Sequence, residues 1–123
     1  MKPNPVGWFE IPCLDIERAK LFYHNAFDAE FEQLEMGPCQ MAMFPYDHDK
    51  PQCTGALVQG PDYEPNHKGV LIYFVCDEVT AQLTRINSAG GRTLEEKMSI
   101  GEHGFIGLFE DSEGNRLGLH SMK

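Results

Sequence analysis

The sequence repeats one order of predicted elements, a strand, a helix and three further strands, on either side of a turn-rich segment near its midpoint. The first copy covers about residues 1–60, the turn-rich segment residues 60–69, and the second copy about residues 70–123. Two copies with a period of roughly sixty residues indicate internal pseudo-symmetry, since solenoids use more and shorter repeats. We therefore expect a single domain of the α+β class, built from two βαβββ modules.

The first copy begins with a predicted strand over residues 6–12, which Pro12 ends because proline has no amide donor. Asp15 is a favourable helix N-cap. One face of the helix after it is apolar, with residues at helical spacing: Ile16, Ala19, Tyr23 and Ala26. Three strands are then expected over residues 29–36, 40–46 and 55–58.

The second copy follows the same order after the turn-rich segment. An apolar strand is expected over residues 70–76, and Asp77 is the predicted cap of a helix that Gly90 and Gly91 end. Strands are expected over residues 93–97, 105–110 and 116–120. This copy therefore completes the second βαβββ module.

Charge and composition exclude several classes of partner. The 123-residue chain carries a formal net charge of -9, which disfavours nucleic acid and anionic membrane surfaces. No apolar run approaches the roughly 18 residues of a transmembrane helix. The polar start of the sequence lacks the apolar region of a signal peptide, so we expect a cytoplasmic protein with reduced cysteines.

Two motifs indicate a family. The run Asp15-x-x-Arg18-Ala19-x-x-Phe22-Tyr23 and the ending from Asp111 to Arg116, in this order of elements, resemble the glyoxalase/bleomycin-resistance/extradiol dioxygenase superfamily, also called vicinal oxygen chelate. Residues 9–12 and 114–120 resemble its branch of predicted enzymes related to lactoylglutathione lyase. The resemblance covers nearly the whole chain. It implies paired modules curled into a half-open mixed β-barrel with helices outside and a pocket inside, often in a homodimer.

The resemblance also locates a metal site in relatives, with ligands on the first and last strands of each module. The matching positions in this chain are Trp8, about Ala56, about Leu71 and Gly118. None has a side-chain lone pair for a divalent cation, since zinc and similar metals need His, Cys, Asp or Glu. We therefore expect no metal and no other cofactor, and instead expect Trp8, Leu71 and Gly118 to contact an organic ligand.

A polar set lies two residues along the same strands. Strand alternation places Glu10 beside Trp8, Tyr73 beside Leu71 and His120 beside Gly118. A carboxyl, a phenol and an imidazole at one apolar cavity are candidate catalytic groups, because burial would raise the pKa of Glu10 toward working pH. The alternative is structural: Glu10 in a core hydrogen-bond network, Tyr73 packed and His120 exposed near the C-terminus.

Three functions remain open from the sequence. The first is a metal-free protein that binds a small molecule in the barrel pocket, by sequestration or as a lyase or isomerase of unknown substrate. The second is a metal-dependent lyase or isomerase in which Glu10 and His120 replace the usual ligands of zinc or nickel. The third is a non-catalytic interaction module. We expect no lactoylglutathione lyase activity, because a site without a metal lacks the group that polarises the enediolate.

Overall fold

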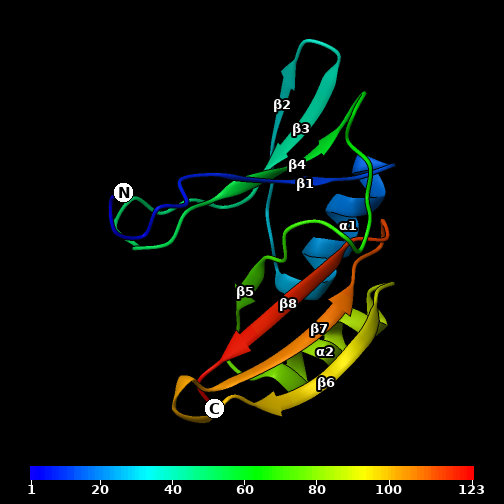
Figure 1. Cartoon of the computed structure of the whole chain (residues 1–123). Coiled ribbons are helices and arrows are strands. Elements are labelled where there is room, and N and C mark those ends of the chain that lie inside the picture. The colour runs from blue at the N-terminus through cyan, green and yellow to red at the C-terminus, as the bar shows by residue number, and fades with distance from the viewer.

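The computed structural model describes all 123 residues and contains two four-stranded sheets, each with one helix (Figure 1). The first sheet has the order β1-β4-β3-β2 and the second β5-β8-β7-β6. The elements are β1 (Phe9–Pro12), α1 (Ile16–Phe27), β2 (Glu32–Met36), β3 (Cys39–Met43), β4 (Gly55–Gln59), β5 (Tyr73–Val75), α2 (Val79–Ser88), β6 (Arg92–Ser99), the 3₁₀ helix η1 (Gly101–His103), β7 (Phe105–Glu110) and β8 (Arg116–Ser121).

The predicted fold class and module order are confirmed. Within each sheet the first strand pairs in parallel with the last, β1 with β4 and β5 with β8, and the remaining pairs are antiparallel. The two modules share a register, since Glu10 lies opposite Ala56 and Tyr73 opposite Gly118. The sheets are separate and are not closed into a barrel.

Three strand predictions are too long at their starts: the strand expected over residues 29–36 begins only at Glu32, and the register explains the other two. The first strand begins at Phe9 instead of residue 6, because β4 offers its first partner, Gly55, opposite Phe9. The strand predicted over residues 70–76 is only Tyr73–Val75, because its ladder with β8 begins at Gly118. Hydrophobicity alone marked both segments, whereas the partner strand decides where pairing starts.

The helices form where the sequence predicts them, with one correction. Asp15 caps α1 by accepting a hydrogen bond from the amide of Arg18, and the predicted apolar face is buried together with Phe22. The predicted cap Asp77 is wrong: the cap of α2 is Glu78, whose carboxylate accepts from the amides of Thr80 and Ala81. Its longer side chain reaches back over the first turn, as a capping carboxylate does.

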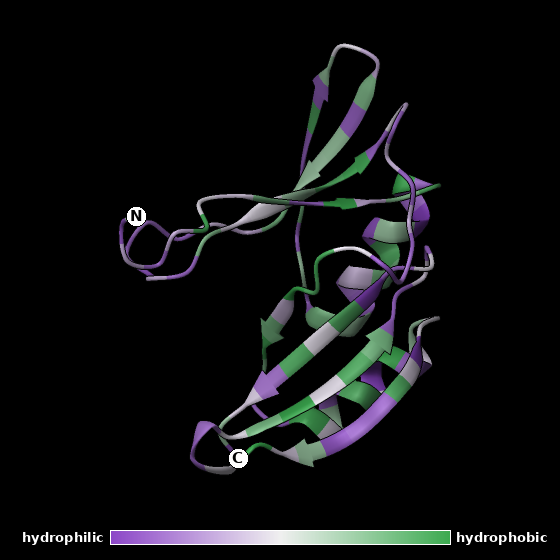
Figure 2. Cartoon of the chain, in the orientation of Figure 1, coloured by the Kyte–Doolittle hydropathy of each residue, from purple (hydrophilic) through white to green (hydrophobic).

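The main core lies between the two modules. α1 packs against its own sheet and against α2, which packs against β6 and β7. One cluster of sixteen buried residues therefore draws on both modules, with Tyr23 touching the rings of Phe22, Phe27, Phe44 and Phe74. Figure 2 shows β4 largely hydrophobic and the edge strand β6 largely hydrophilic. No helix has the length and apolar character that crossing a membrane requires.

A buried turn of the second module forms hydrogen bonds to the first module. The carboxylate of Asp111 accepts hydrogen bonds from the Tyr23 hydroxyl at 2.7 Å and from the side chain of Asn115 at 2.9 Å. Asn115 also donates to the backbone carbonyl of Pro12 at 2.7 Å. Burial raises the pKa of Asp111 despite these donors. The turn between β7 and β8 thereby fixes where β1 and α1 sit relative to β8.

Candidate functional site

The side of the first sheet away from α1 carries a carboxylate held by two neutral donors. The Tyr63 hydroxyl donates to one oxygen of Glu10 at 2.6 Å, and the indole N–H of Trp8 donates to the other at 3.3 Å. Trp8 and Glu10 therefore share a face, as strand alternation predicts. The hydrogen bond to Glu10 raises the pKa of Tyr63. Glu10 is exposed, so the buried carboxylate expected from the sequence is not found.

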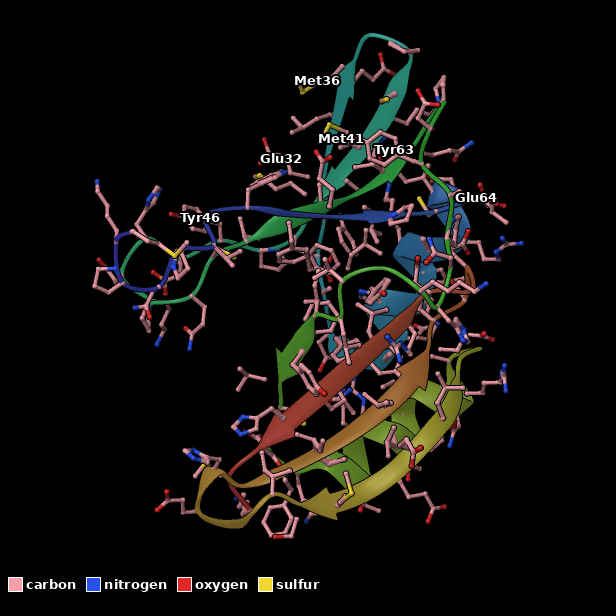
Figure 3. The ribbon with its side chains drawn as sticks, viewed as in Figure 1. Glu32, Met36, Met41, Tyr46, Tyr63 and Glu64 are labelled. Carbon is pink, nitrogen blue, oxygen red and sulfur yellow. The ribbon has the colours of Figure 1, made fainter.

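An apolar surface lies beside this trio. Met41, Ala56 and Val58 are buried on the same face, and Tyr63 packs against them from the turn-rich segment. Figure 3 shows Tyr63 and Met41 together on the side of the sheet away from α1. The sequence carries no signal for Tyr63, because a residue between the modules has no strand or helix period that would indicate which face it covers.

A groove of about 1070 Å³ separates the N-terminal segment and β1 from β5. Ten of its fifteen lining residues are hydrophobic, and Glu10 is the one charged residue among them. Four of the six predicted site residues line it: Trp8, Glu10, Leu71 and Tyr73. Trp8 and Tyr73 are 43% and 42% exposed. The groove therefore presents two accessible rings to a ligand.

Gly118 lies beneath the ring of Tyr73. A Cβ atom at this position would come within 2.3 Å of the Tyr73 ring, so a side chain here requires the ring to move. Gly118 is buried and does not line the groove. In this chain the aromatic ring of Tyr73 takes the space in which a side chain of residue 118 would lie.

His120 is separated from the other predicted catalytic residues. Its Nε2 is 2.6 Å from the backbone carbonyl oxygen of His103, in the turn between β6 and β7. It pairs in register with Val75 on β5, whereas Glu10 belongs to the other sheet. The structure therefore does not bring Glu10 and His120 together within one chain.

The residues present do not fit a divalent cation. Trp8, Ala56, Leu71 and Gly118 offer no ligand atoms, and no three His, Cys, Asp or Glu side chains gather at a distance suited to a metal ion. The proposed substitutes Glu10 and His120 lie on different sheets. Glu10 instead accepts hydrogen bonds from Tyr63 and Trp8, and no group of three His, Cys, Asp or Glu side chains surrounds it to complete a metal site.

Comparison with known proteins gives the same fold. Fosfomycin resistance protein FosX of Listeria monocytogenes matches with a TM-score of 0.73 and 18% identity, over 100% of this chain and 94% of that chain. TnmS3, an antibiotic binding protein from a Streptomyces species, matches with a TM-score of 0.69 and 21% identity, over 100% and 99%. Zea mays glyoxalase I matches with a TM-score of 0.71 and 17% identity, and the chain spans about half its length (98% and 47%).

Sequence comparison identifies the family. A glyoxylase-like domain-containing protein of Didymella fabae is 27% identical over 114 residues, which are 89% of this chain and 88% of that protein. The model of the Glyoxalase/Bleomycin resistance protein/Dioxygenase superfamily matches residues 6–119. The match takes in both βαβββ modules and the segment between them. The chain therefore belongs to the glyoxalase/bleomycin resistance protein/dioxygenase superfamily.

Proposed function

We propose that this protein binds a flat, largely apolar small molecule in the groove between β1 and β5, without a divalent metal ion. The observation that carries the proposal is the pair of accessible rings, Trp8 and Tyr73, on a groove whose other walls are mainly hydrophobic. Pockets for drug-sized ligands are mostly apolar with a few polar groups that fix orientation. Glu10, oriented by Tyr63 and Trp8, supplies such a group.

The charge of the groove favours neutral or cationic ligands. Glu10 is its one charged lining residue, and the whole chain carries a net charge of -9. An aromatic ring attracts a cation held over its face, and Trp8 is the best ring for this contact. An anionic ligand would meet an unfavourable field both locally and at long range.

Binding is better supported than catalysis. The predicted catalytic set is not assembled, because Glu10 and Tyr73 line the groove whereas His120 does not, and Glu10 and His120 stand on separate sheets. TnmS3, which shares the fold, is named as an antibiotic binding protein. A lyase or isomerase activity with Glu10, Tyr73 and His120 as its catalytic groups stays a prediction, as does a cytoplasmic location.

The test uses Trp8, which is the single tryptophan of the chain and lies in the groove. Titration with the flat cation proflavine should quench its fluorescence to saturation, and the flat anion naphthalene-1-sulfonate should bind more weakly. Tyr73→Ala should weaken proflavine binding about 3- to 10-fold, because an aromatic contact contributes about 0.5–1.5 kcal/mol. The matched control is Tyr46→Ala, an exposed tyrosine on a loop that does not line the groove (Figure 3). Unchanged affinity in Tyr73→Ala would contradict the proposal.

A homodimer is the expected assembly, and two features support it. β1 and β5 are edge strands, each with one unpaired side. Val70 and Val75, next to and within β5, are 92% and 69% exposed. Open strand edges with apolar neighbours are ready templates for pairing with another chain. Light scattering at micromolar concentration should give twice the 13.9 kDa mass of the chain, and a monomer would count against this assembly.

A further inference from the structure

A second, smaller cavity lies at the seam between the two modules, and we call it the seam pocket. It measures about 190 Å³ and is lined by the end of β1, the turn-rich segment and the start of β8. Its polar lining residues are Glu10, Asn66, His67, Asn115 and Arg116. It shares Glu10, Val70 and Ile72 with the groove but not the aromatic rings. The volume is below the range of about 300–1,000 Å³ that is typical for drug-sized ligands, so its occupant is small.

Arg116 is the one arginine of four that forms no ion pair. Arg18, Arg85 and Arg92 bond to Glu113, Asp28 and Glu110 respectively. The carboxylate opposite Arg116 in the β7–β8 register is Glu110, but Arg92 and His67 already occupy it, at 2.9 and 2.6 Å. Arg116 is therefore left partly buried, in an acidic protein, without a carboxylate.

Glu10 is a carboxylate without a cationic partner. Both of its oxygens accept hydrogen bonds from neutral groups, Tyr63 and Trp8, and no lysine, arginine or histidine lies within ion-pair distance. Each carboxylate oxygen can accept more than one hydrogen bond, so both keep capacity for a further donor. The seam pocket thus carries one uncompensated charge of each sign, and the two are not paired with each other.

We propose that the seam pocket binds a compact zwitterion of the size of a small amino acid. The carboxylate of the ligand pairs with the guanidinium of Arg116, whose planar fork suits bidentate carboxylate recognition. The ammonium of the ligand is placed toward Glu10. A molecule with both charges pairs with both groups, whereas a simple anion or cation pairs with only one of them. This pocket adjoins the proposed aromatic groove and shares Glu10 with it, whereas Arg116 belongs to the seam pocket alone.

The test compares one zwitterion with its two halves. L-Alanine, acetate and methylammonium are titrated separately into the full chain, and binding is followed by amide chemical shifts in ¹H–¹⁵N spectra. L-Alanine should bind at least ten-fold more tightly than either half, with the largest shifts at residues 66–70 and 115–117. Acetate that binds as tightly as L-alanine, or no saturable shift with L-alanine, would overturn the proposal.

Two variants, each with a matched control, test which residue binds each charged group of the ligand. Arg116→Gln and Glu10→Gln should each weaken L-alanine binding at least ten-fold. Lys68→Gln removes a positive charge from the exposed neighbouring segment, and Glu32→Gln removes a negative charge from exposed β2; both should bind as the unmodified chain does. Arg116→Gln should leave proflavine quenching of Trp8 unchanged, since Arg116 does not line the groove. Equal weakening by Lys68→Gln and Arg116→Gln would show a general charge effect and refute the assignment.

Discussion

Glu113 is the side chain whose replacement should most directly loosen the two modules. It belongs to the turn between β7 and β8, its side chain is 0% exposed, and it binds the start of α1 in the other module. It accepts hydrogen bonds from the amides of Leu14 and Asp15 at 2.9 and 2.8 Å, and from Arg18 at 2.7 and 3.0 Å. Glu113→Gln keeps the shape but removes the charge and turns one acceptor into a donor.

The expected cost follows from these contacts. Hydrogen bonds to charged groups contribute about 1.5–3 kcal/mol each, and breaking a buried ion pair costs about 3–5 kcal/mol. Arg18 is 51% exposed and regains water, so the lower end applies, about 3 kcal/mol. With an unfolding entropy of about 2.1 cal/mol/K per residue, this lowers the Tm of the 123-residue chain by about 12 °C.

Urea unfolding and a thermal melt at pH 7 measure this loss. Glu17→Gln is the matched control, because Glu17 lies in the first turn of the same helix but its side chain is 76% exposed. It should change the free energy of unfolding by less than about 0.5 kcal/mol. If Glu113→Gln is as stable as Glu17→Gln, the turn does not hold the modules together and the reasoning is refuted.

Two further predictions concern Gly118 and acid stability. Gly118→Ala should push the Tyr73 ring aside, since the new Cβ would lie 2.3 Å from it, and should lower both stability, by about 1–3 kcal/mol, and proflavine affinity; unchanged affinity would contradict the placement of the ring. The hydrogen bond from Lys97, together with those from the amides of Thr80 and Ala81, lowers the pKa of Glu78 from 4.5 to about 2. A lowered carboxyl pKa stabilises the folded state above the unfolded value, so this contribution should fade as pH falls from about 4.5 to 2. Urea unfolding at pH 6 and pH 3 should therefore show a smaller acid loss in Glu78→Gln than in the unmodified chain, and an equal loss would contradict the lowered pKa of Glu78.

The fold was largely predictable from the sequence because local signals carry it. Asp15 and the apolar spacing after it mark α1, and residues 105–110 match β7 at both ends. Strand starts were less predictable, as at Phe9 and Tyr73, because a strand begins where a neighbouring strand supplies its first hydrogen-bonded partner. The openness of the two sheets has no local signal, since it depends on how α1 and α2 pack.

The site was only partly predictable. Alternation along β1 placed Trp8 and Glu10 on one face, and their hydrogen bond agrees with that placement. Tyr63 and Arg116 could not be predicted, because their roles depend on tertiary contacts. Tyr63 binds Glu10 from the turn-rich segment. Arg116 has no ion pair because Arg92 and His67 bind Glu110, the carboxylate opposite it. Alternation places His120 on the same face of β8 as Gly118. It does not indicate whether that face lies near Glu10, which belongs to the other sheet.

The most direct test of a metal-free aromatic groove is a proflavine titration of Trp8 fluorescence with and without metal. One sample is treated with chelator, and the others receive a stoichiometric amount of zinc or nickel. The groove offers no ligand set for either ion, so the three dissociation constants should agree within two-fold, and Glu10→Ala should release no bound metal. Binding that is lost with chelator and restored by zinc or nickel would contradict the account.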